Sequence, residues 1–223
     1  EKYPGEFEGQ RPSFKTILLR RSRAFWSNRL TRVFPPGIWP RTGGFDMQMA
    51  DLGDIALHYR EDGPPDGAPV VFANSLGTDL RLWDDILPHL PDGLRIIRYD
   101  MRGHGLSDCP KGPYSMGALV RDAERLLDHL HIRDCVFVGV SIGGMVAQGL
   151  AVKRLDVMRA MVLSNTAAKI GQPEMWAERI ATVEDGGVAA LSEATLARWF
   201  SRAFRATPQI TAWRHMLERT PAS

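Results

Sequence analysis

The residues best suited to chemistry lie in the pentapeptide Gly139-Val140-Ser141-Ile142-Gly143. A serine between glycines, with an apolar run before it and a helical pattern after it, is typical of a nucleophile on a sharp strand-to-helix turn. Glycine is needed because side chains at the flanking positions would clash with neighbouring backbone. The turn exposes the Ser141 hydroxyl and places the Ile142 amide at a helix N-terminus, where it can stabilise an oxyanion. The motif predicts acyl transfer by Ser141; the alternative is a plain loop serine beside glycines.

An acyl-transfer serine also needs a second oxyanion donor. That donor is expected in the loop after an earlier buried strand, and Asn74-Ser75-Leu76-Gly77 occupies such a position. We predict that the backbone N–H of Leu76 is the donor. The alternative is an ordinary strand-to-helix turn in which Gly77 only provides shape.

The general base is missing from this pattern. The triad acid and histidine should follow the serine on loops after later strands, yet the single histidine beyond Ser141, His215, lies in a helical pattern. We interpret His215 as a surface or packing residue, and His104, in a Gly-His-Gly loop, as shaping the loop beside the active-site mouth. The remaining histidines are expected on strand or helix surfaces: His58, His89, His129 and His131. No residue is assigned as triad acid or histidine, so we expect only weak residual catalysis.

The elements that position these residues alternate between strands and helices. Apolar runs bounded by turn residues predict strands at 47–52, 55–59, 69–73, 94–99, 135–140 and 158–163, the first two as an edge hairpin. Apolar periodicity predicts helices at 80–90, 115–130 and 145–153. This alternation predicts an α/β fold, with a mostly parallel sheet and helices on both faces, over residues 47–168. Helical patterns at 174–183, 188–199 and 210–217 predict a helical cap region over 169–223, within which the chain ends.

Residues 1–46 differ in composition from the rest. They are rich in arginine, notably at 20–23 and 29–32, and contain scattered prolines and glycines. An Arg-rich, Ser-bearing start suggests a transit peptide, but we favour an upstream translated extension, with the true start near Met47 or Met49. We expect this atypical basic N-terminal extension to be poorly ordered.

Bulk composition narrows the class of protein. Hydrophobic residues make up 44% and charged residues 24%, as in soluble globular proteins, and the net charge of +2 gives no reason to expect a nucleic-acid partner. No apolar run is long enough for a membrane helix, and no spacing suggests metal ligands. Two cysteines, Cys109 and Cys135, are too few for a disulfide framework, which favours a reducing, cytoplasmic compartment.

The motifs together resemble the α/β-hydrolase superfamily. The stretches that carry this resemblance are Phe72–Asp79, Tyr99–Ser107 and Val138–Gly144. Within the superfamily the chain is most similar to the 3-oxoadipate enol-lactonases of bacterial aromatic catabolism, and Asn165–Gly171 with Met175-Trp176 share that similarity. The resemblance covers residue 47 to the C-terminus.

The resemblance implies hydrolysis of 3-oxoadipate enol-lactone to 3-oxoadipate without a metal or organic cofactor. Ser141 would attack the lactone carbonyl while the Leu76 and Ile142 amides hold the oxyanion. No position matches the family's acid and histidine. We therefore expect a C-terminally truncated chain with an exposed sheet edge.

Two alternative functions remain open. Another serine hydrolase of this fold, acting on esters or carbon–carbon bonds, would differ in its pocket lining, for which Trp176, Trp199, Trp213 and the arginines of the cap are candidates. A non-catalytic hydrolase-fold module would bind a ligand or partner without turnover. Dehalogenase-like and epoxide-hydrolase-like chemistry is disfavoured, because those relatives carry aspartate at the position of Ser141. The sequence leaves the oligomeric state open.

Overall fold

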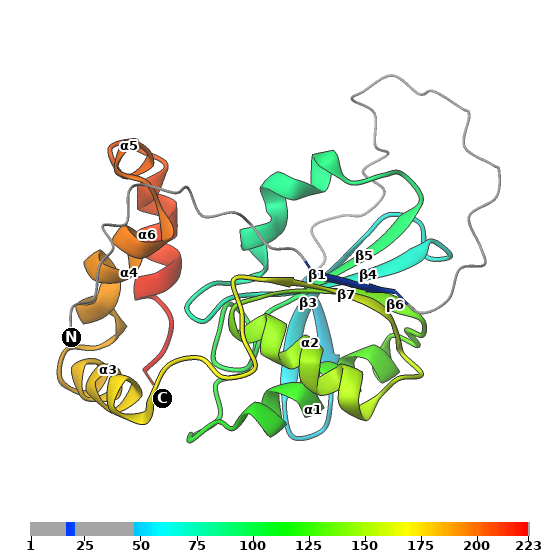
Figure 1. Ribbon diagram of the computed structural model, residues 1–223, viewed down its shortest axis with the longest axis horizontal. Coiled ribbons are helices and arrows are strands. Elements are labelled where there is room, and N and C mark those ends of the chain that lie inside the picture. The colour runs from blue at the N-terminus through cyan, green and yellow to red at the C-terminus, as the bar shows by residue number, and fades with distance from the viewer. Residues whose placement is uncertain (1–16, 21–46, 223) are drawn as a thin grey trace, which may run out of the picture.

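A computed structural model describes residues 17–20 and 47–222 of the chain. In these ranges a seven-stranded sheet has the strand order β1-β7-β6-β4-β5-β3-β2 (Figure 1). The strands are β1 (Ile17–Arg20), β2 (Gln48–Asp51), β3 (Ala56–Asp62), β4 (Ala68–Ala73), β5 (Leu94–Tyr99), β6 (Cys135–Val140) and β7 (Met158–Ser164). Strands β5, β4, β6 and β7 run parallel, whereas β2 and β3 form the predicted antiparallel edge hairpin. The predicted α/β fold is confirmed.

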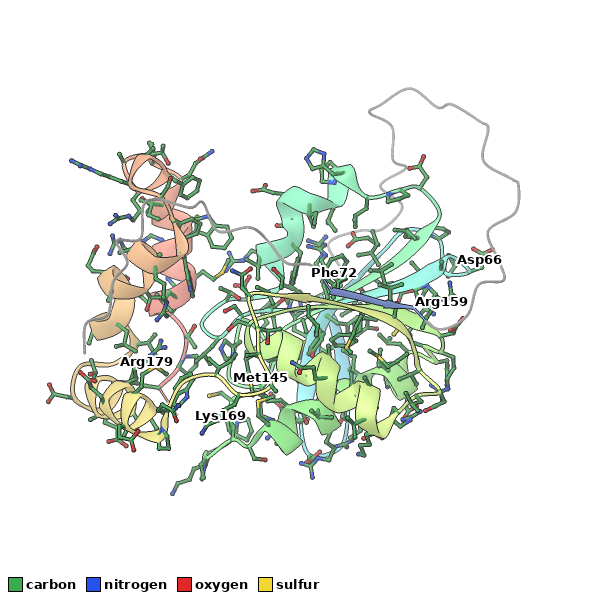
Figure 2. The ribbon with its side chains drawn as sticks, in the orientation of Figure 1. Asp66, Phe72, Met145, Arg159, Lys169 and Arg179 are labelled. Atoms are coloured by element: carbon green, nitrogen blue, oxygen red, sulfur yellow. The ribbon has the colours of Figure 1, made fainter. Side chains whose placement is uncertain are left out.

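The two faces of the sheet bury different side chains because successive strand residues point to opposite sides. Helices α1 (Met116–His129) and α2 (Ile142–Lys153) cover one face, where Phe137 packs with Leu126 and Leu150. The 3-10 helix η1 (Leu80–His89) covers the other, where Phe72 lies with its ring centroid 4.8 Å from that of Trp83 (Figure 2). Figure 1 shows α1 and α2 together on the face opposite η1.

Two predicted helices differ from the structure. Segment 80–90 is a 3-10 helix, with three residues per turn and with Pro88, which lacks a backbone donor, inside it. Its buried residues Leu80 and Trp83 are accordingly three positions apart, whereas the apolar Ile86 is 40% exposed. Helix α2 begins at Ile142 rather than at Met145. The low helix propensity of Gly143 and Gly144 favoured a later start, but both residues are helical in the structure.

The cap consists of helices that follow β7. They are α3 (Pro173–Gly186), η2 (Val188–Leu191), α4 (Ser192–Trp199), α5 (Arg202–Arg205) and α6 (Ile210–Glu218). The predicted helix at 188–199 is therefore divided in two, and α5 was not predicted. Figure 1 shows the cap as a group beside the sheet, connected to it by the loop after β7. An aromatic cluster joins its helices, with the Phe200 ring 4.7 Å from Phe204 and 5.1 Å from Trp213.

Of residues 1–46 the structure describes four positions. Ile17–Arg20 form β1, which pairs antiparallel with β7 so that Ile17 lies opposite Leu163 and Arg20 opposite Ala160. We expected an exposed sheet edge, and β7 would be such an edge without β1. An unpaired edge strand presents free backbone N–H and C=O groups, and at these positions β1 pairs with them. The rest of the segment lies outside the described residues. No helix in the described part of the chain is long and apolar enough to span a bilayer.

Candidate active site

Ser141 occupies a strained turn between β6 and α2. Its backbone has φ 55° and ψ −120°, a conformation rare for a residue with a side chain and costing about 1–3 kcal/mol. The surrounding backbone holds it there, because Ser141 N–H donates to the Ser164 carbonyl (3.0 Å). The Ser141 carbonyl accepts from Thr166 Oγ1 (2.6 Å) and from Gly144 N–H (3.0 Å). The strand-to-helix turn predicted from the motif is thus present and fastened to β7.

Glycines beside this turn allow a very close backbone approach. A Cβ on Gly139 would lie 2.3 Å from the Gly143 carbonyl oxygen, and one on Gly143 would lie 2.2 Å from the Ala73 carbonyl oxygen. Neither distance leaves room for a side chain, which confirms the steric reason for the motif. The approach also brings Gly143 N–H within 3.1 Å of the Asn74 carbonyl, so the start of α2 is tied to the end of β4.

The two predicted oxyanion donors lie in the segments joined by this bond. Ile142 is the first residue of α2, and Leu76 is the second residue of a turn closed by Thr78 N–H to the Ser75 carbonyl (3.1 Å). Within the described residues neither the Ile142 nor the Leu76 amide donates a hydrogen bond. Such unused donors at a helix N-terminus and in a neighbouring turn suit an oxyanion.

A buried polar network anchors the oxyanion loop. Asn74, fully buried, donates from Nδ2 to the Tyr99 carbonyl (2.8 Å) and accepts at Oδ1 from Trp83 Nε1 (2.7 Å). The Asp100 carboxylate, at the end of β5, accepts from Leu80 N–H (2.7 Å) and also contacts His58 Nδ1 (2.8 Å). The surface position predicted for His58 is wrong, because its strand, β3, lies inside the sheet and turns the imidazole onto Asp100.

No described histidine or carboxylate is hydrogen-bonded to the Ser141 hydroxyl. His215 is exposed on α6, on the cap. His104 is buried, with both ring nitrogens hydrogen-bonded to backbone groups. Among residues 17–20 and 47–222, no three His, Cys, Asp or Glu side chains are grouped as metal ligands would be.

The cap touches the site at the oxyanion loop. A Cβ at Gly77 would lie 2.6 Å from Leu217 Cδ1 and 3.6 Å from a ring carbon of Trp199. Of the three tryptophans proposed from the sequence, Trp199 is thus the one against the oxyanion turn. Leu217 was not predicted, because a helical pattern does not indicate which distant loop the helix will contact.

Trp176 plays a different part, at the start of α3. Its Nε1 donates to the Ile170 carbonyl (2.8 Å), and the Arg179 guanidinium lies 5.3 Å from its ring centroid. Figure 2 shows Arg179 among the cap helices. Arg179 has no carboxylate partner in the described part of the chain.

A mostly apolar cavity of about 350 Å³ lies beside the Ser141 turn, on the η1 face of the sheet. Its lining residues are Leu82, Trp83, Asp85, Ile86, His89, Val140 and Ser164. Ser141 and Leu76 do not line it. The cavity therefore adjoins the turn at Val140 and does not include the nucleophile.

The parallel sheet and the strained serine turn at the carboxyl end of β6 define an α/β-hydrolase architecture. The chain belongs to the alpha/beta hydrolase fold family, whose model matches residues 68–214. It is 38% identical over 151 residues to 3-oxoadipate enol-lactonase 2 of Acinetobacter baylyi, a match that covers 68% of this chain and 57% of that protein.

Solved structures agree. A hydrolase from Pseudomonas aeruginosa superposes with a TM-score of 0.76 at 37% identity, covering 81% of this chain and 69% of that one. The enol-lactonase from Burkholderia xenovorans gives 0.72 at 36% identity, covering 78% and 69%. The resemblance identified from the motifs is confirmed, and the chain spans little more than half the length of the Acinetobacter relative.

Proposed function

We propose that this chain is a serine hydrolase of lactones that converts 3-oxoadipate enol-lactone to 3-oxoadipate in aromatic catabolism. The observation that carries the proposal is the strained Ser141 turn, with the unused amides of Ile142 and Leu76 in the segments that flank it. The similarity to 3-oxoadipate enol-lactonase 2 supports the choice of substrate. Residues 47–168 would supply the chemistry and residues 169–223 the cap.

The reaction follows from the groups at this turn. Ser141 Oγ forms a bond to the lactone carbonyl carbon, and the carbonyl electron pair moves to the oxygen, which accepts hydrogen bonds from the Leu76 and Ile142 amides. Collapse of this intermediate re-forms the carbonyl and breaks the ring C–O bond. The enolate so released remains part of the acyl group, and its carbon takes up, through water, the proton that Ser141 Oγ has lost, which gives the ketone. Water then cleaves the ester to Ser141 and releases the second carboxylate.

Arg179 supports a substrate with a negative charge. It is partly buried, lacks a carboxylate partner within the described residues, and lies over Trp176. Desolvation, and after it the positive charge of Arg198, lower the pKa of Arg179. A bound carboxylate, such as the one 3-oxoadipate enol-lactone carries, would relieve this repulsion.

No described residue is proposed as triad acid or histidine, so we expect residues 1–223 to acylate slowly and to deacylate more slowly still. A lactone loses no fragment when it opens, and Ser141 would therefore gain the full mass of the substrate. Intact-mass spectrometry after incubation with 3-oxoadipate enol-lactone should detect this adduct. Ser141→Ala is the matched control and should show none.

Other results would favour the alternatives. An acyl adduct with a simple aryl ester but none with the lactone would indicate an esterase. A folded chain that forms no Ser141 adduct with either compound, or with a fluorophosphonate, would contradict the hydrolase proposal and favour a binding module.

A further inference from the structure

The imidazole of His104 connects two loops that are distant in sequence. The side chain is 8% exposed, and its ring contacts the Arg102 carbonyl through Nδ1 (3.0 Å) and the Gly77 backbone N–H through Nε2 (2.9 Å). A carbonyl can only accept and an amide can only donate, so Nδ1 must carry the proton and Nε2 must present its lone pair. The two contacts leave one protonation state, the neutral Nδ1–H tautomer.

Gly77 lies at the position that decides the shape of the oxyanion turn. Ser75 to Thr78 form a four-residue turn closed by Thr78 N–H to the Ser75 carbonyl (3.1 Å), and Gly77, its third residue, has φ +81°. A positive φ at that residue alone is the mark of a type II turn. Types I and II differ chiefly in a rotation of the central peptide, here the peptide from Leu76 to Gly77. By accepting the Gly77 N–H, His104 fixes this peptide in the type II orientation.

We propose that His104 is a positioning residue for the oxyanion hole: by holding the Leu76–Gly77 peptide in the type II orientation, it fixes the form of the turn whose preceding peptide, Ser75–Leu76, carries the Leu76 N–H. This inference rests on the proposed function in one respect, the assignment of Leu76 as oxyanion donor. Without the acceptor at Nε2, the buried Gly77 N–H has no partner and the central peptide is free to rotate.

The surroundings of the ring suit this role. The other side of the loop is already held, by Ser75 N–H to Thr78 Oγ1 (3.1 Å) and by the Asn74 side chain, so His104 supplies the remaining constraint. Burial lowers the pKa of His104, although the nearby carboxylates of Asp100 and Asp79 act in the opposite direction. The neutral ring is thereby favoured near pH 7.

The direct test is NMR on the uniformly ¹⁵N-labelled chain at pH 7.5. We expect ring shifts showing a protonated Nδ1 and an unprotonated Nε2, together with a ¹⁵N–¹⁵N coupling across the hydrogen bond between the Gly77 amide and His104 Nε2. A protonated Nε2, or a ring without this coupling, would overturn the proposal. This measurement does not depend on Ser141 being reactive, so it separates failure of the inference from failure of the proposed function.

Two variants test the consequence for the site. His104→Leu removes the acceptor, and we expect displaced or exchange-broadened Leu76 and Gly77 amide signals and fluorophosphonate labelling of Ser141 slower by about tenfold or more. His104→Gln keeps an acceptor and should restore most of both. The control is His129→Leu, an exposed histidine on α1. Equal spectra and labelling rates for His104→Leu and this control would refute the positioning role; if His104→Leu does not fold, His104→Gln and the wild-type coupling decide.

Discussion

Replacing Gly143 by alanine should disrupt the contact between the start of α2 and the end of β4. The new Cβ would lie 2.2 Å from the Ala73 carbonyl oxygen and 2.6 Å from that of Asn74. The first distance is about 1 Å shorter than a C–H···O contact. Both neighbours are backbone atoms of β4 and its loop, which cannot rotate away as a side chain would. The start of α2 must therefore move away from Asn74.

The expected loss of stability combines three terms. Overpacking costs about 1–3 kcal/mol, and weakening the bond from Gly143 N–H to the Asn74 carbonyl costs about 1 kcal/mol. Higher helix propensity returns up to about 1 kcal/mol. The net change in the free energy of unfolding is a loss of about 1–3 kcal/mol, measurable by urea denaturation.

The functional loss should be larger. The Ile142 and Leu76 amides lie on opposite sides of the widened contact, and a displacement of about 1 Å lowers reactivity by about a hundredfold. The assay is the rate of fluorophosphonate labelling of Ser141, followed by intact mass. The matched control is Gly117→Ala, also at the second position of a helix, where the nearest atom to a new Cβ is Ser115 Oγ at 3.7 Å. If Gly143→Ala is as stable and as rapidly labelled as Gly117→Ala, the reasoning is wrong.

Three further predictions concern the Asn74–Trp83 hydrogen bond, the Arg102–Asp122 ion pair and the protonation of His104. Asn74→Ala leaves the buried Trp83 Nε1 without its acceptor and should cost about 2–4 kcal/mol in urea denaturation; a loss below 1 kcal/mol would contradict this. Asp122→Asn breaks the buried ion pair with Arg102 and should cost about 3–5 kcal/mol by the same measurement, since it leaves an uncompensated buried charge. His104 has a pKa lowered from 6.5 mainly by burial, so below that pH the unfolded chain binds more protons than the folded one. The stability that its neutral ring supplies is present above pH 6.5 and lost as pH falls through the lowered pKa. The stability advantage of wild type over His104→Gln should shrink accordingly, and a constant difference from pH 5 to 8 would refute this.

Much of the fold could be predicted from local pattern. The predicted strands 94–99 and 135–140 coincide with β5 and β6. The run without charged residues at 135–140 is typical of a strand covered on both faces. Segment 80–90 was harder, because its 3-10 geometry depends on Pro88 and on how Trp83 fits against the sheet. Strand β1 was not foreseen at all, since strand pairing depends on the edge that β7 offers rather than on composition.

The sequence by itself determined the nucleophile turn, because the requirement for glycine around Ser141 is local and can be recognised in five consecutive residues. It also located the loop that carries Leu76. Only the tertiary structure decided what holds that loop: the lone pair of His104, 27 residues away, on the Gly77 amide, and the side chain of Leu217 from the cap. These contacts join segments whose separation along the chain carries no periodic signal, so they exist only once the sheet has brought the ends of its strands together.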